Sequence, residues 1–209
     1  MLARRDHRLA FNIRKPHINS CQILQLPSTA LQHIRHLLPF YNAQTLACSL
    51  ILSQLDYCNA VLYGCSAHAT GQLQHVQNYA AHVVTQSNRY TPSQLLLRSL
   101  HCLPVQQRLV YKAALITYKA VTTSTLSYLN DLLAVHIPDG PTHCSSTHSL
   151  LTVPYIASNF ARRSFCFVSP TIWNSLPPSD VQWSPLQATL KSRLKTHLLN
   201  IAFNDQPEL

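Results

Sequence analysis

The sequence predicts a mainly α-helical fold: a helical bundle over about residues 26–135, followed by a small α+β region. Two observations support this fold class. Apolar residues recur every three or four positions through most of the first 135 residues, which is the period of a helix. After residue 148 the pattern changes to short runs rich in β-branched and aromatic residues, which favour strands.

The composition divides the chain of 209 residues into four segments. Residues 1–25 are basic and show no clear period, so we expect a disordered leader. Residues 26–135 carry the helical pattern. Residues 136–148 contain two prolines, Gly140 and a Ser/Thr/His cluster, which are typical of a linker loop. Residues 149–209 would form the C-terminal α+β region.

Proline and glycine mark the first two helices. Pro27 and Ser28 open a predicted helix over Thr29–Leu38, which Pro39 closes. Asn42 is the expected N-cap of a helix over Ala43–Tyr63, and Gly64 would end it. Apolar residues surround the axis of this second helix, which predicts a buried central helix: Leu46, Leu50, Ile51, Leu52, Leu55, Val61 and Leu62.

A third helix is predicted over about Ala69–Gln86, with an apolar face formed by Leu73, Val76, Ala80, Val83 and Val84. His68, His75 and His82 repeat every seven residues on another face. Neighbouring histidines are then about 10 Å apart along the axis, too far to share a metal ion. The stripe is either a solvated face or the weakened remnant of a phosphate-binding face.

Proline also opens the next two helices. Thr91 and Pro92 begin a short helix to about Leu100, and Pro104 begins a long helix over Val105–Thr122. A short helix follows at Leu126–Ala134.

The C-terminal region is expected to begin with a hairpin formed by Leu150–Ile156 and Ser164–Val168. Ser169 and Pro170 would then start a short helix in which Trp173 is a core anchor. Ser184 and Pro185 start the last helix. Its apolar stripe consists of Leu186, Leu190, Leu194, Leu198 and Ile201.

The chain contains five short sequence motifs. In order, they are SQLDYCNAVLYG at Ser53–Gly64, LQHVQNYAAH at Leu73–His82, LHCLPV at Leu100–Val105, TYKA at Thr117–Ala120 and IWNSLP at Ile172–Pro177. Over roughly residues 30–203 the chain resembles the C-terminal, post-palm region of the reverse-transcriptase polyprotein of LINE-type non-LTR retrotransposons. The resemblance implies thumb-like and C-terminal segments that help to hold template RNA and target DNA. It also implies that the catalytic palm, with its Asp-Asp pair, is absent.

The acidic residues argue against catalysis independently of this resemblance. Two-metal nucleotidyl transfer needs several carboxylates at one site. The chain has seven acidic residues, no two of them adjacent. Asp56, alone on an apolar helix, is better explained as a hydrogen-bonded structural residue. We therefore expect no enzymatic activity, no catalytic residues and no small-molecule substrate.

Cysteine and histidine spacing does not predict a metal site. Cys58 and Cys65 are seven positions apart, and the tight local cluster is His143, Cys144 and His148. Structural zinc sites need closely spaced ligand pairs, so we expect neither metal nor cofactor. Seven cysteines, an odd number, and the lack of a signal peptide predict reduced thiols and an intracellular, non-secreted protein. No apolar run approaches the ~20 residues of a membrane span.

The net charge of +9 suggests a polyanionic partner, RNA or DNA. The predicted nucleic-acid-binding residues are Arg162, Arg163, Lys191, Arg193 and Lys195. Weak, sequence-independent nucleic-acid binding is the expected function. One alternative is a decayed, translated repeat with no selected function, since His and Gln stand where the family has basic residues. Another is a protein-interaction module using the face that would pack on the missing palm.

Overall fold

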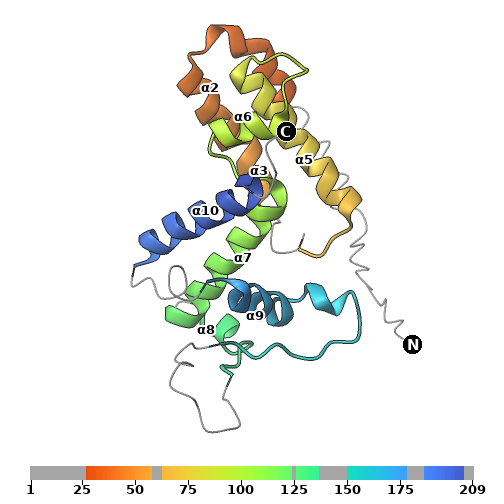
Figure 1. Cartoon of the computed structure of the whole chain (residues 1–209), viewed down its shortest axis with the longest axis vertical. Helices are drawn as coiled ribbons and strands as arrows, with labels where there is room; N and C mark the ends of the chain where they lie inside the picture. The colour runs from red at the N-terminus through yellow and green to blue at the C-terminus, as the bar shows by residue number, and fades with distance from the viewer. Residues whose placement is uncertain (1–26, 58–62, 124–125, 137–149, 178–185, 205–209) are drawn as a thin grey trace, which may run out of the picture.

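The structure is a computed structural model that describes residues 27–57, 63–123, 126–136, 150–177 and 186–204 (Figure 1). The described chain is mainly helical, which confirms the predicted fold class. Its helical elements are residues 27–34, η1 (Arg35–Leu37), α2 (Phe40–Ala47), η2 (Cys48–Leu52), α3 (Ser53–Tyr57), α5 (Ala67–Thr85), α6 (Ser93–Ser99), α7 (Val105–Thr122), α8 (Ser127–Asn130), η4 (Ala161–Arg163), α9 (Phe165–Ser175) and α10 (Gln187–Asn204). The predicted leader and all but the first residue of the predicted linker lie outside the described residues.

The first helix ends as predicted, before Pro39. Residues 27–34 are α-helical and η1 adds a 3-10 turn. Arg35 in this turn is buried, and its Nε donates to the carbonyl of Val84 at 2.9 Å. The first helix is thereby tied to the end of α5.

The second helix runs without a break through α2, η2 and α3, but two predictions about it are wrong. Pro39, not Asn42, is the N-cap, since the helix already begins at Phe40. The helix is also not buried on all sides: Ala43, Ala47, Ile51 and Leu55 are buried, whereas Leu50 is 46% exposed. The apolar residues do surround the axis, but other helices cover only the face defined by the four-residue spacing.

The middle of this helix is a π-helical turn, η2. A π turn inserts an extra residue into the helical repeat and shifts the side chains that follow it. Two serine hydroxyls bond back to the backbone here: Ser49 Oγ donates to the carbonyl of Leu46 at 3.1 Å, and Ser53 Oγ donates to that of Ser49.

Helix α5 agrees closely with its prediction. Ser66 caps its first turn by accepting from the Ala69 amide at 3.4 Å, and Gln86 ends it with a φ of 51°. All five residues of the predicted apolar face are buried. They form a first core with the helices around them, to which Leu31, Ile51, Leu96 and Leu97 contribute.

Helix α7 has the predicted bounds and joins two cores. Its N-terminal end packs on α5 and its later turns pack on α9 and α10 (Figure 1). The second core consists of Leu103, Ala113, Ala114, Tyr118, Leu151, Val168, Ile172, Trp173, Leu176, Leu190, Leu194 and Leu198. Trp173 is 6% exposed, so its predicted role as a core anchor is confirmed.

The predicted hairpin is not seen. Its second segment begins α9, because Ser164 is the N-cap and Phe165 is already helical. Leu151 instead forms an isolated antiparallel bridge with Val135, just after the short helix α8. Aromatic and β-branched residues suggested a strand, but Val168, Ile172 and Leu176 are spaced for a helix that packs on α7.

Ser169 and Pro170 therefore lie inside α9, not at its start as predicted. Ser169 Oγ is 2.5 Å from Thr117 Oγ1 of α7, and both residues are fully buried. Thr117 Oγ1 also donates to the carbonyl of Ala113 at 2.9 Å. This polar contact between two small residues lets α7 and α9 approach closely.

In α10 the middle of the predicted apolar stripe is confirmed. Leu190, Leu194 and Leu198 are buried, whereas Leu186 and Ile201 at the two ends are exposed. No helix in the described part of the chain is both long and apolar enough to cross a bilayer.

Candidate nucleic-acid interface

A groove of about 530 Å³ lies where α3, α7, α10 and the loop before α7 meet. Its polar lining residues include Asp56, His101, Arg108, Tyr111, Lys112 and Lys195. We call it the basic groove. Its volume lies within the roughly 300–1,000 Å³ that ligand pockets occupy.

The position of α7 is fixed by two glutamines of α5. Gln77 Nε2 donates to the carbonyl of Leu103 at 2.8 Å, and Gln74 Oε1 accepts from the amide of Val105 at 2.8 Å. The second bond satisfies one of the free amides at the start of α7. With the helix start fixed, Arg108 and Lys112 at positions i and i+4 share the face that lines the groove.

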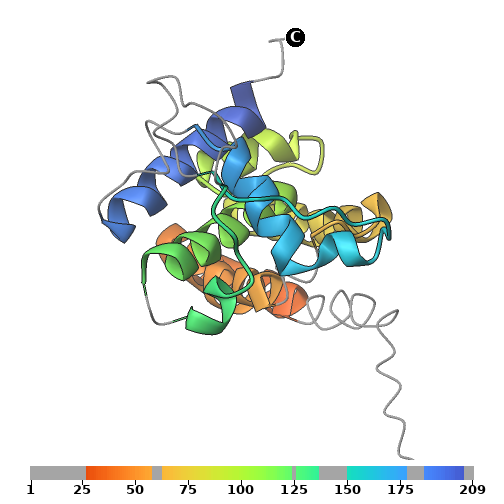
Figure 2. The same ribbon diagram turned by 90° about the horizontal axis from the view of Figure 1, so that it is seen from below.

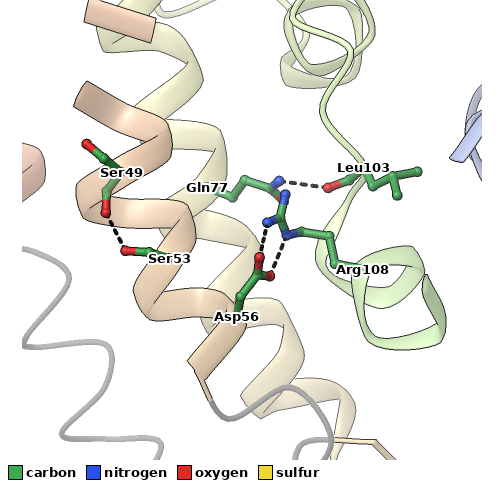
Figure 3. Close-up of polar contacts among 6 residues, drawn as sticks. All are labelled: Ser49, Ser53, Asp56, Gln77, Leu103 and Arg108. Carbon is green, nitrogen blue, oxygen red and sulfur yellow. Dashed lines mark hydrogen bonds and ion pairs between the residues drawn. The ribbon is translucent and has the colours of Figure 1, made fainter. Parts of the chain in front are cut away.

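Arg108 forms a two-bond ion pair with Asp56 of α3 (Figure 3). Arg108 Nε is 3.1 Å from Asp56 Oδ1, and Nη2 is 2.7 Å from Oδ2. The side chains of Arg108 and Asp56 are 17% and 30% exposed, so the pair is partly desolvated. The prediction that Asp56 is a hydrogen-bonded structural residue is confirmed.

The pair leaves the groove positively charged. Asp56 is the one carboxylate among its described lining residues, and Arg108 neutralises it. Lys112 of α7 and Lys195 of α10 supply the remaining fixed charge. Burial raises the pKa of the Tyr111 hydroxyl, with Arg108 opposing the rise and Asp56 adding to it. Tyr111 therefore remains a neutral hydrogen-bond donor at physiological pH.

Of the five predicted binding residues, Lys195 alone lines this groove. Lys191 and Arg193 are exposed on α10 but do not line it. Arg162 and Arg163 lie in η4, the cyan turn before α9. The structure does not bring them to the α10 residues, since η4 and the N-terminal half of α10 lie on opposite sides of α9 (Figures 1 and 2).

The two arginines of η4 make contacts within the protein. Arg162 Nε donates to the carbonyl of Ile156 at 3.2 Å. Arg163 packs over Gly64, where an added Cβ would be 3.2 Å from the Arg163 Cγ, and its Nη1 is 3.8 Å from Cys65 Sγ. Gly64 has a φ of +72°, a conformation that glycine adopts without strain. Arg163 is thus half-buried against the turn before α5.

Sequence reasoning missed Arg108, Lys112 and His101. Arg108 and Lys112 stand four positions apart in α7, next to the buried positions Leu109 and Ala113. A basic pair at this spacing beside an apolar stripe is a signal that could have been recognised. Nothing in the local sequence indicates that this face meets Asp56, 52 residues earlier.

Histidine and cysteine do not gather into a metal site among the described residues. In the histidine stripe, His68 and His75 are exposed, as expected for a solvated face, but His82 is half-buried. The cluster of His143, Cys144 and His148 lies outside the described residues.

The chain was compared with protein-family models, curated proteins and solved structures, and it matches none of them. Its resemblance to the LINE-type polyprotein therefore depends on the five sequence motifs alone.

Proposed function

We propose that this chain is a non-catalytic nucleic-acid-binding protein that holds the backbone of a single strand in the basic groove. The observation that carries the proposal is that Lys112 of α7 and Lys195 of α10 line the same groove, whose one described carboxylate is already paired. Two cations that line one groove from different helices suit the phosphates of a backbone that passes through it. The proposal agrees with what the LINE-type resemblance implies.

The size and chemistry of the groove favour a single strand. Its volume of about 530 Å³ is that of a ligand-sized pocket, which suits a few nucleotides of a flexible strand better than the broad surface of a duplex. Tyr111 offers a hydroxyl donor and a ring face, which single-strand sites commonly use. The contacts are charges and one phenol, so affinity should depend little on base sequence and strongly on salt.

The groove favours binding over covalent catalysis. Two cysteines line it, Cys48 and Cys102, and burial raises the pKa of the Cys102 thiol, with Cys48 adding to the rise. A thiol that resists ionisation is a weak nucleophile. Asp56 is engaged with Arg108 and is an unsuitable base.

The test is fluorescence anisotropy with labelled oligothymidylate between 50 and 200 mM salt. With two or three phosphates neutralised, the slope of log affinity against log salt should be roughly −1.5 to −2 on single strands. In the Lys112→Gln/Lys195→Gln variant we expect the slope to approach zero, since each lost phosphate contact removes about 0.7. Circular dichroism would show that the variant remains folded.

Two controls locate the site. Lys119→Gln removes an exposed charge from α7 outside the groove and should leave affinity unchanged. Arg162→Gln tests the basic residues of η4 that the sequence suggested. Two results would contradict the proposal. One is that the wild-type protein does not bind at 50 mM salt, and the other is that either control weakens binding as much as the Lys112→Gln/Lys195→Gln variant does.

A protein contact is the second candidate, and exposed apolar residues near the start of α2 favour it. Leu37 and Tyr41 are 72% and 75% exposed, and Phe40 and Ile34 are also exposed. An apolar surface of this kind is typical of a contact site. It shares no residue with the basic groove, so the variants above distinguish the two functions.

A further inference from the structure

A second and larger groove, of about 1,000 Å³, lies between η1, α5 and the start of α6. It shares no lining residue with the basic groove. We call it the histidine groove, because its lining includes His36, His75 and His82 together with Arg35 and Arg89. Tyr79 Oη donates to Gln32 Oε1 and joins two of its walls.

No carboxylate is among the described residues that line the histidine groove. The described residues include two acidic side chains, Asp56 and Asp131. Asp56 lines the basic groove and is paired with Arg108, and Asp131 follows α8. The charged and titratable groups that line the histidine groove are Arg35 and His36 from η1, His75, Tyr79 and His82 from α5, and Arg89 from the loop before α6.

Arg35 is a buried cation beneath this groove, 9% exposed. Its Nε donates to the carbonyl of Val84, and its Nη1 donates to that of Leu38 at 2.7 Å. Buried charges are usually paired with an opposite charge. Within the described chain Arg35 has only these carbonyl partners, so an anion in the groove would supply the missing counter-charge.

His82 provides a second, independent indication. Its Nε2 is 3.2 Å from Ser93 Oγ, while its Nδ1 is buried and has no hydrogen-bond partner among the described residues. A protonated imidazole has two N–H donors. The Ser93 hydroxyl can accept one of them, and the described residues supply no acceptor for the other.

We propose that the histidine groove binds a tetrahedral oxyanion of the phosphate type, and that it does so more tightly when its imidazoles are protonated. This site goes beyond the proposed function and does not depend on it. Imidazoles gain their charge as the pH falls from about 8 to 5. Each added charge attracts the anion, so affinity rises on acidification. One unit charge at about 4 Å is worth about fivefold in affinity even in water.

Sulfate is the first probe, because its charge does not change over this pH range. We would titrate it at constant ionic strength, balanced with chloride, at pH 5.5 and 7.5. Binding would be followed through the Cε1–H signals of the labelled histidines. We expect binding at pH 5.5 to be at least about fivefold tighter than at pH 7.5. His75→Gln and Arg89→Gln, both changes of exposed residues, should weaken it severalfold.

A short oligothymidylate is the second probe and distinguishes a free ion from a phosphodiester backbone. It would be used in the Lys112→Gln/Lys195→Gln background, which removes the basic groove. Binding of sulfate alone would assign a free oxyanion to the site, and binding of both would assign the backbone as well.

His68→Gln and Arg98→Gln are matched controls, since these exposed residues lie on α5 and α6 but outside the groove. Affinity for sulfate that is equal at the two pH values, or that is lost equally in the controls, would overturn the proposal. So would the absence of any shift at His75 and His82.

Discussion

The thiol of Cys102 lies beside both the first core and the basic groove. Burial raises its pKa above the ordinary value, and Cys48 raises it further, while Arg108 and Lys195 act in the opposite direction. Burial is the largest of these effects, so the neutral thiol is the form that the folded state accommodates. The residue is therefore a packing element whose ionisation acts against folding.

Alkaline pH should consequently destabilise the protein through this residue. In the unfolded chain the thiol ionises near its ordinary pKa of 9.0, while the folded thiol still holds its proton. Above that pH the folded state binds more protons than the unfolded state, so the free energy of unfolding falls as the pH rises. We expect the fall between pH 8.5 and 10.5 to be smaller in Cys102→Ala, measured by urea unfolding.

Cys48→Ala is the control for this measurement, because Cys48 is exposed and raises the pKa of Cys102 less than burial does. It should retain most of the pH dependence. Parallel stability curves for wild type and Cys102→Ala would show that the thiol does not carry the effect.

Single residues show what the sequence could and could not predict. The ion-paired role of Asp56 and the positive φ of Gly64 follow from local chemistry, namely a lone carboxylate on an apolar helix and a residue free to adopt that conformation. Whether the predicted helix runs to Gly64 depends on residues 58–62, which lie outside the described residues. The partner Arg108 does not, because a pairing across 52 residues depends on how α3 and α7 pack. The grouping of Lys195 with Lys112 depends on the same packing.

At the scale of elements, the side chain of Asn174 makes the pair of backbone hydrogen bonds that a neighbouring strand would make. Asn174 of α9 donates from Nδ2 to the carbonyl of Leu151 at 2.8 Å, and its Oδ1 accepts from the Leu151 amide at 3.0 Å. The amide group pairs with the backbone as a neighbouring strand would. Leu151 itself is 3% exposed and enters the second core. Asn174 thus fixes the extended segment after residue 149 against α9.

Removing this amide should release the segment. Asn174→Ala leaves the amide and carbonyl of Leu151 without their partner, which costs about 1–3 kcal/mol per group when the site stays dry. Over the two groups we expect the free energy of unfolding to fall by about 2–6 kcal/mol and exchange of the Leu151 amide to accelerate. Asn200→Ala on the exposed face of α10 is the control and should have little effect. Equal losses in the two variants would argue against the anchoring role.

The elements also differ in how well the sequence predicts them. Helices α5 and α7 were predicted well, because a continuous apolar stripe defines each and Pro104 marks the start of α7; the Ser66 cap, which begins α5 two residues before the predicted Ala69, was not used. For α9 the sequence predicts a strand followed by a helix, since its first four residues are aromatic, cysteine or β-branched. Only its packing on α7, through Ser169 and Thr117, shows that one helix continues through Pro170.

At the scale of the whole molecule, few charges cover a large amount of apolar surface. Charged residues make up 11% of the chain, against about 25% in typical soluble proteins. Large exposed side chains occur on several elements, among them Leu37, Tyr41, Tyr90, Tyr128, Tyr155, Phe160 and Leu186. Further positive charge can come from surface histidines. Six of them are exposed: His33, His36, His68, His75, His101 and His136.

Solubility should therefore increase as the pH falls from about 7.5 to 5.5. The chain already carries a net charge of +9 with its histidines neutral, and protonation of the exposed imidazoles adds charge of the same sign. Greater mutual repulsion between molecules opposes association through apolar surface. We would measure the soluble fraction and the near-ultraviolet circular dichroism across this range in a buffer free of phosphate and sulfate, which keeps the histidine groove empty of added oxyanion.

Leu37→Ser/Tyr41→Ser should raise the soluble fraction at pH 7.5, because it removes two of the most exposed apolar side chains. A monodisperse monomer with sharp tertiary signals at pH 7.5 would contradict this expectation, and would show that the two cores joined by α7 suffice without a further domain to cover them.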